Sequence, residues 1–192
     1  MTQPSRQGMT ASDLNWSQIK AFERLSDSGI EKLKGNSALL RFGVGQPISD
    51  SRGLPAKVLI VLQGECRLIG KEKDRLTTLV RMGAGSFIGL ASLLRAKACE
   101  PVNAATDLVA VAIPDQLIVE LYTTELSFRH WCDETLWPCE VAELLGELLE
   151  QLPKSDQSLK RRLKTMVEQA SLLPKSESQK DNYESNTQLK QR

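Results

Sequence analysis

The sequence predicts a mainly β protein: an antiparallel jelly roll, or double-stranded β-helix, with helices before and after it. The first observation is a series of about seven short apolar segments between residues 38 and 113, separated by glycine, proline and polar turn residues. The second is a change to helical spacing of the apolar residues after Pro114. Short strands at close intervals are typical of an antiparallel sandwich, whereas alternating β and α segments would indicate a parallel sheet.

The chain begins with a polar stretch, residues 1–11, which we expect to be disordered. From Ser12 the apolar residues recur at helical spacing, which predicts a capped helix. Residues 26–29, with the sequence Ser-Asp-Ser-Gly, predict a break, and a further short helical turn follows at Ile30 and Leu33. The apolar residues of the first helix are Trp16, Ile19 and Phe22.

The central segments have the composition of strands. Val58–Leu62 is a continuous, partly β-branched apolar run of the kind found in buried strands. Gly64 can adopt a positive φ and therefore predicts a tight turn into the next strand, in which Cys66 and Leu68 share one face. The predicted strands include residues 38–44, 58–62, 65–70, 76–82, 102–106 and 108–113.

The stretch Arg81–Ala104 has the pattern of a binding element. A strand ends at Met82, glycines follow it, and residues 88–94 predict one or two helical turns before a basic loop leads back into a strand. Unpaired N–H groups at a helix start, preceded by glycines, make a natural cradle for an anion. The basic loop contains Arg95 and Lys97, which would either assist that anion or form an ordinary solvated loop.

The residues after Pro114 predict several helices. Asp115 can cap the first, residues 127–137 form a second segment rich in aromatic residues, and Pro138 starts another. The broad apolar stripe at 141–152 would either form a homodimer or partner interface or fold back on the jelly roll. We expect one domain over residues 12–153, an amphipathic basic helix over 154–173 and a disordered tail or linker over 174–192.

The composition excludes several classes of function. The hydrophobic fraction of 41% and the net charge of +1 are those of an ordinary globular chain, with no general attraction to nucleic acid. The chain has no apolar run of the roughly 18–20 residues that a membrane span needs. No signal peptide and no C-x-x-C pair occur among the four cysteines, so we expect a cytoplasmic protein with reduced thiols.

Enzymatic and metal-binding patterns are not found in the sequence. The single histidine, His130, lies outside the predicted strands, and with Cys132 and Cys139 it fits no familiar zinc spacing. No nucleophile elbow and no Walker A sequence occur. We therefore expect no catalytic residues, no metal and no enzymatic activity.

Three segments resemble the cyclic-nucleotide-binding domain family. Residues 22–25 look like its opening helix motif, residues 58–70 like its strand–glycine–strand hairpin, and residues 85–94 like its phosphate-binding cassette. The resemblance covers roughly residues 16–150. It implies small helices, an eight-stranded jelly roll and C-terminal helices that move when ligand binds. The amino-acid sequence at residues 92–100, together with the later segment VAELLGELL, is similar to that of a narrower group, the N-terminal domains of peptidase-containing ABC exporters.

Two departures from the family pattern bear on the ligand. Nucleotide-binding members of the family have a glutamate directly after the cassette glycine for the ribose hydroxyl, and here that position is Leu90. They also hold the cyclic phosphate with an arginine shortly before the return strand, a place that falls near Ala98. A buried phosphate without that charge-assisted partner is poorly held. The sequence therefore disfavours tight binding of cyclic AMP or cyclic GMP and predicts no cofactor.

The candidate ligand-binding residues lie in and just after the predicted cassette. Cys99 is open to two interpretations, a redox sensor beside the basic loop or a small core residue. The candidate residues are Gly89, Leu90, Ala91, Ser92, Arg95, Lys97 and Cys99.

The sequence favours a non-enzymatic regulatory or sensor module with a degenerate phosphate-binding cassette. It would control a transporter such as an ABC exporter, or another partner, through its C-terminal helices, in the cytoplasm or at the cytoplasmic face of the membrane. The alternatives are a transcription regulator of the related cyclic-nucleotide-responsive family and a true cyclic nucleotide receptor. A nucleic-acid partner is disfavoured because no recognition helix follows the jelly roll.

Overall fold

The computed structural model describes residues 10–50, 52–72 and 75–143. The chain divides into two units, residues 1–141 and 142–192, and the fold below is that of the first. The predicted helix at 154–173, the predicted tail at 174–192 and nearly all of the apolar stripe at 141–152 lie outside the described residues.

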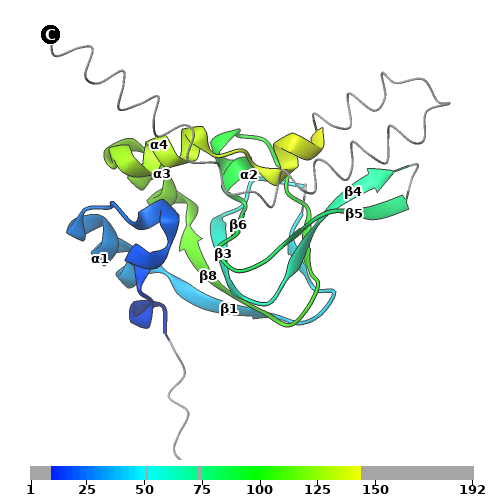
Figure 1. Cartoon of the computed structure of the whole chain (residues 1–192), viewed down its shortest axis with the longest axis horizontal. Helices are drawn as coiled ribbons and strands as arrows, with labels where there is room; N and C mark the ends of the chain where they lie inside the picture. Colours follow the sequence, from blue (N-terminus) through cyan, green and yellow to red (C-terminus); the bar gives the residue numbers. More distant parts are fainter. Residues whose placement is uncertain (1–9, 51, 73–74, 144–192) are drawn as a thin grey trace, which may run out of the picture. The chain divides into compact units, whose positions relative to one another are not determined.

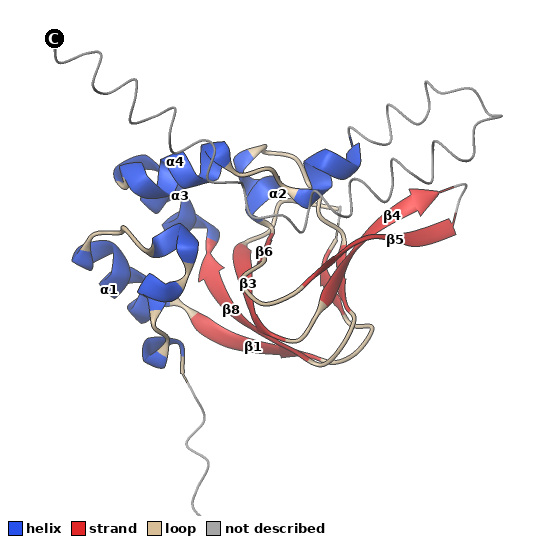
Figure 2. Ribbon diagram, viewed as in Figure 1, coloured by secondary structure: helices blue, strands red, loops and turns tan. Residues whose placement is uncertain are grey.

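Two antiparallel sheets of four strands each form the body of the first unit, which confirms the predicted jelly-roll class (Figure 1). One sheet has the order β1-β8-β3-β6 and the other β2-β7-β4-β5. Helices α1, α3 and α4 gather on one side of the strands, as Figure 2 shows. The first sheet consists of β1 (Ala38–Phe42), β8 (Leu108–Pro114), β3 (Lys57–Gln63) and β6 (Phe87–Ile88). The second consists of β2 (Pro47–Ser49), β7 (Val102–Ala104), β4 (Cys66–Glu72) and β5 (Arg75–Met82).

The first sheet contains the apolar run that predicted a buried strand. Val58–Val61 of β3 are all buried, and β3 pairs with both β8 and β6. Burial of four large aliphatic side chains supplies about 1.5–3 kcal/mol each. Strand β6 was not predicted, because two residues are too few to show any periodicity.

The turn between β3 and β4 requires glycine, as predicted. Gly64 has a φ of +87°, and a Cβ placed there would lie 2.3 Å from the carbonyl oxygen of Asp107. In β4, the side chains of Cys66 and Leu68 are buried, whereas Glu65, just before the strand, is exposed. The predicted alternation of faces is therefore confirmed.

The N-terminal helix prediction is partly wrong. Residues 11–22 form three 3-10 turns, η1 (Ala11–Asp13), η2 (Trp16–Gln18) and η3 (Lys20–Phe22), instead of one capped helix. The spacing of Trp16, Ile19 and Phe22 is three residues, which suits the three residues per turn of a 3-10 helix. Trp16 is buried, and its indole N–H donates to the Ala11 carbonyl oxygen at 3.1 Å.

The break predicted at residues 26–29 is also wrong, because this segment starts helix α1 (Asp27–Asn36). Ser26 is the N-cap, and its hydroxyl accepts a hydrogen bond of 3.1 Å from the N–H of Gly29. Serine is among the preferred N-cap residues, so Ser-Asp-Ser-Gly here is a helix start.

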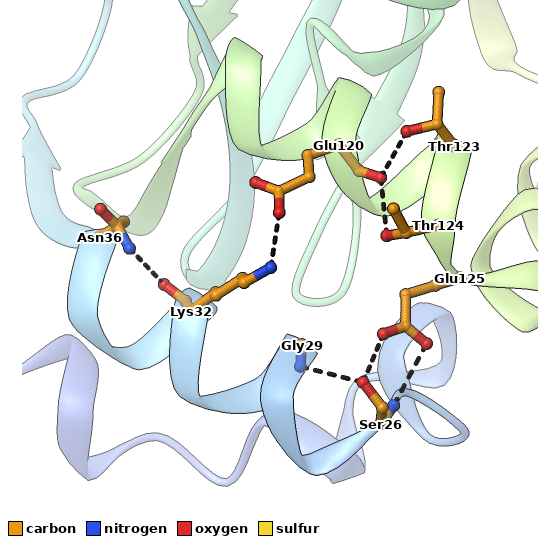
Figure 3. A network of polar contacts seen from close by, with 8 residues as sticks. All are labelled: Ser26, Gly29, Lys32, Asn36, Glu120, Thr123, Thr124 and Glu125. Atoms are coloured by element: carbon orange, nitrogen blue, oxygen red, sulfur yellow. Dashed lines mark hydrogen bonds and ion pairs between the residues drawn. The ribbon is translucent and has the colours of Figure 1, made fainter.

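Helix α1 is tied to α3 (Asp115–Thr124), the helix that follows the last strand (Figure 3). The Ser26 hydroxyl donates to the carboxylate of Glu125, the residue at the end of α3. Nearer the other end of α1, Lys32 Nζ lies 2.5 Å from Glu120 Oε1. Two polar contacts therefore fix the N-terminal helix against the first C-terminal helix.

We expect the Ser26→Ala variant to lose about 1 kcal/mol of unfolding free energy, because it removes both the helix cap and the contact with Glu125. Urea denaturation followed by circular dichroism measures the loss. Ser28→Ala is the matched control, since Ser28 is exposed in the first turn of the same helix and should change stability by less than about 0.5 kcal/mol. Equal losses in the two variants would contradict the role of Ser26.

Helix α3 is followed by α4 (Leu126–Glu134), and residues 138–143 are helical, as predicted from Pro138. An aromatic cluster, defined here as Trp16, Phe22, Phe87, Phe128, Trp131 and Trp137, joins these helices to the sheet. Phe87 of β6 lies 5.0 Å from Trp131 of α4 and 6.5 Å from Trp137, between ring centroids. The strand that leads into the predicted cassette is thus packed directly on the C-terminal helices.

Among the described residues, no helix combines the length and the apolar character that a membrane span requires.

Candidate functional site

The predicted phosphate-binding cassette has the expected geometry. β6 ends at Ile88, Gly89 turns the chain with a φ of +89°, and helix α2 (Leu90–Leu94) follows. A Cβ at Gly89 would lie 3.0 Å from Pro55 Cγ and 3.3 Å from the Lys57 carbonyl oxygen, so a larger residue would push against the neighbouring loop. Because the N–H groups of a first helical turn have no partner within the helix, this turn needs an acceptor.

That acceptor comes from the chain itself. One carboxyl oxygen of Glu100, Oε2, accepts hydrogen bonds from the backbone N–H of Ser92 at 2.8 Å and from the Ser92 hydroxyl at 2.9 Å. The backbone N–H of Gly89 lies near enough to the same carboxyl group to lower its pKa. Glu100 is only 4% exposed and Ser92 only 2%. The cradle predicted for an anionic ligand is therefore filled by an internal carboxyl group.

The surroundings of Glu100 shift the pKa of its carboxyl group in opposite directions. Burial raises the pKa of the Glu100 carboxyl, and the nearby carboxylate of Glu140 raises it further. The hydrogen bonds from Ser92 and Gly89 lower the pKa, but burial is the larger influence, so the pKa lies above its ordinary value. The carboxyl group fills the cradle in either protonation state, since a neutral carboxyl retains an acceptor oxygen.

The predicted site residues divide into those at the cradle and those beside it. Leu90 and Ala91 are fully buried in the core, and Ser92 is the residue that binds Glu100. The structure therefore places Leu90 away from solvent, and its side chain has no acceptor for a ligand hydroxyl.

The two predicted cations do not face an open cradle. The guanidinium of Arg95, the residue that ends α2, lies 3.7 Å from the Glu140 carboxylate, measured from Nε to Oε1. Lys97 is exposed, and its backbone N–H donates to the Ser92 carbonyl oxygen at 3.1 Å. Arg95 consequently links the cassette to the helical residues 138–143.

Cys99 lies within the same network. Its backbone N–H donates to the Ser92 hydroxyl at 3.1 Å, and its sulfur lies 3.5 Å from that hydroxyl. Its sulfur also lies 3.5 Å from the sulfur of Cys139, a residue forty positions further along the chain. Cys99 is partly exposed and Cys139 is buried.

Glu100 is the functional residue that the sequence reasoning missed. The one feature of the sequence that points to this residue is its position: a carboxylate directly before Pro101 and the apolar return strand, inside an otherwise apolar or basic loop. A charged residue beside a buried strand needs a partner, and the nearest unsatisfied donors are those of the cassette helix. Among the described residues, no group of three or more His, Cys, Asp or Glu side chains is arranged to hold a metal ion.

No protein-family model matches the chain, and no curated protein matches it. Solved structures do match. A candidate cyclic nucleotide-binding protein from Geobacter metallireducens is 16% identical, with a TM-score of 0.51 over 69% of this chain and 94% of that one. A candidate transcriptional regulator of the CRP/FNR family from Eubacterium rectale is 18% identical, with a TM-score of 0.50 over 59% and 54% of the two chains.

The regulatory subunit of a cAMP-independent protein kinase A from Trypanosoma brucei also matches, at 14% identity over 62% of this chain. Its TM-score of 0.49 is too low to support an inference. This chain spans about half of that subunit, 48% of its length.

These likenesses show the fold alone. The chain has the jelly-roll fold found in cyclic nucleotide-binding domains, as the sequence resemblance predicted. The structures named here give no support for the narrower resemblance to exporter domains, which stays a prediction.

Proposed function

We propose that this chain is a non-enzymatic regulatory module, with the shape of a cyclic nucleotide-binding domain and a cassette that Glu100 occupies permanently. The observation that carries the proposal is the hydrogen-bonded contact of the Glu100 carboxyl group with both the N–H and the hydroxyl of Ser92. A ligand phosphate would have to displace this buried group and then replace its hydrogen bonds.

Such a displacement is unfavourable for three reasons. A phosphate close to the Glu100 carboxyl would place a second acceptor beside it and compete for the two donors of Ser92. No arginine stands at Ala98, where the family resemblance would place the charge-assisted partner of the phosphate. Leu90 is buried and offers no acceptor for a ribose hydroxyl, so that hydroxyl would lose its hydrogen bonds with water.

We propose that the module acts through its C-terminal helices on a larger partner, for which a peptidase-containing ABC exporter is one candidate. The aromatic cluster supports this proposal, because Phe87 precedes the cassette and packs on Trp131 and Trp137. A change in the packing of Trp131 and Trp137 would reach the cassette through Phe87, and the reverse also holds. A ligand or partner that switches the module must bind one packing arrangement of the helices more tightly than the other.

We expect the purified chain to show no binding of cyclic AMP or cyclic GMP by isothermal titration calorimetry, even at ligand concentrations in the millimolar range. A cooperative thermal transition of the same sample shows that the chain is folded. Saturable binding with a dissociation constant in the micromolar range would contradict the proposed function.

The same titration on the Glu100→Ala variant separates two causes of exclusion. Binding that appears only in the variant would show that Glu100 alone keeps the nucleotide out. A variant that also fails to bind would show that Leu90 and Ala98 are sufficient to exclude it.

A further inference from the structure

We propose that Cys99 and Cys139 form a reversible disulfide, a modification site that links the cassette loop to the helical segment 138–143. Their sulfur atoms lie 3.5 Å apart. A disulfide bond is about 2.05 Å long, so the two sulfurs need to approach by about 1.5 Å. The two residues are forty positions apart in the sequence, and only the fold brings them together.

Local contacts favour this pairing. Arg95 and Glu140 already link the same two elements, with 3.7 Å between Nε and Oε1. Cys99 is held from its backbone by the Ser92 hydroxyl, which fixes the loop beside the helix. Groups held at contact distance react as if one were present at a very high concentration. The closing step is therefore intramolecular.

The oxidant is a small-molecule disulfide, and the reaction is thiol–disulfide exchange in two steps. Cys99, the partly exposed thiol, loses its proton and attacks one sulfur of the small disulfide, which forms a mixed disulfide and releases one small thiol. The Cys139 sulfur then attacks Sγ of Cys99, forms the protein disulfide and releases the second small thiol. The two cysteines lose two electrons and two protons in total, and the small disulfide gains both.

The other two cysteines are poorer partners. Cys66 and Cys132 are 0% and 2% exposed, so a small disulfide does not reach them in the folded chain. Burial raises the pKa of Cys66 to about 11 and that of Cys132 to about 12. Burial also raises the pKa of the Cys139 thiol, so its reaction depends on its position beside Cys99 and not on a high thiolate fraction.

This inference does not depend on the proposed function, since it concerns only the chemistry of two sulfurs. The disulfide would affect the cassette at one place, next to Glu100. Cys99 directly precedes Glu100 and contacts Ser92, so the disulfide would fasten the group that fills the cradle to the segment that begins at Pro138.

The test incubates the full folded chain with mixtures of glutathione and glutathione disulfide, quenches with acid, and alkylates the free thiols under denaturing conditions. We expect loss of two of the four titratable thiols. Peptide mapping by mass spectrometry should find one cross-linked pair, Cys99 with Cys139, within one chain, and addition of dithiothreitol should restore both thiols.

A variant at Cys139 tests the order of the two steps. In Cys139→Ala, Cys99 should accumulate as its mixed disulfide with glutathione, which the wild-type chain should not retain. Cys132→Ala is the matched control and should form the Cys99–Cys139 bond as the wild type does. A wild-type chain that keeps four thiols, retains the mixed disulfide, or forms only disulfides between two chains would overturn the inference.

Discussion

The Glu100→Ala variant is expected to lose about 2–4 kcal/mol of unfolding free energy. Removal of the carboxyl group leaves the N–H and the hydroxyl of Ser92 buried without their acceptor. Each buried donor that loses its partner costs about 1–3 kcal/mol. Urea denaturation monitored by tryptophan fluorescence measures the loss. A change of less than 0.5 kcal/mol, a typical value for a surface site, would contradict the buried contact.

Glu100→Gln is the matched control, because glutamine keeps the length of the side chain and one acceptor oxygen. We expect it to lose less stability than Glu100→Ala. The difference between wild type and Glu100→Gln should also depend on pH. Because the folded-state pKa of Glu100 is raised, its contribution to stability is fully present below the ordinary value of 4.5 and is lost as the pH rises through the folded-state value.

The same comparison gives the sign of the pH effect. As the pH increases from 4.5, the unfolding free energy of the wild type should fall relative to that of Glu100→Gln, and should level off once Glu100 is ionised. A wild type that gains stability over the variant with rising pH would show that the hydrogen bonds outweigh burial.

The second large effect is expected at the centre of the aromatic cluster. Phe22 is 0% exposed, and its ring contacts Trp16, Phe87 and Phe128 at centroid distances between 5.5 and 5.9 Å. Phe22→Ala should lose about 3–5 kcal/mol of unfolding free energy, because it removes a buried ring and leaves a cavity. Thermal and urea denaturation both measure this loss.

An exposed apolar residue provides the comparison for Phe22. Leu136 is 70% exposed and lies between α4 and the helical residues 138–143. Leu136→Ala should change stability by less than about 0.5 kcal/mol. If Phe22→Ala were as mild as this control, the cluster would not be a rigid link between β6 and the helices.

Most of the strands could be predicted from the sequence, because their apolar runs and turn residues are local features. Val58–Val61 of the predicted strand 58–62 are buried, and Gly64 adopts the predicted positive φ. The shortest elements could not be predicted, for a physical reason. Phe87–Ile88 forms a strand through pairing with Leu59 and Ile60, and nothing in two residues shows that pairing. The prediction of a break at residues 26–29 is wrong because a capping serine and a turn serine look alike in sequence.

The position of the candidate site could be predicted from the sequence, but the side chain that occupies it could not. The glycines and the short helix placed the cassette at residues 85–94, and the structure confirms that geometry. The occupation by Glu100 depends on where a side chain eight positions after Ser92 points, which no periodicity determines. The pairing of Cys99 with Cys139 depends on the packing of the segment around Cys139 and Glu140 beside the cassette loop.

The central claim is that the amide of Ser92 is satisfied by Glu100 and that the turn from Gly89 to Ser92 is closed to an external phosphate. Amide chemical shifts in a two-dimensional ¹H–¹⁵N spectrum test it directly. During titration with inorganic phosphate and then cyclic AMP, the Gly89 and Ser92 signals should stay in place, and during a pH titration they should move with the ionisation of Glu100. A saturable shift of both signals with either ligand in the wild-type chain, together with no response to pH, would contradict the claim.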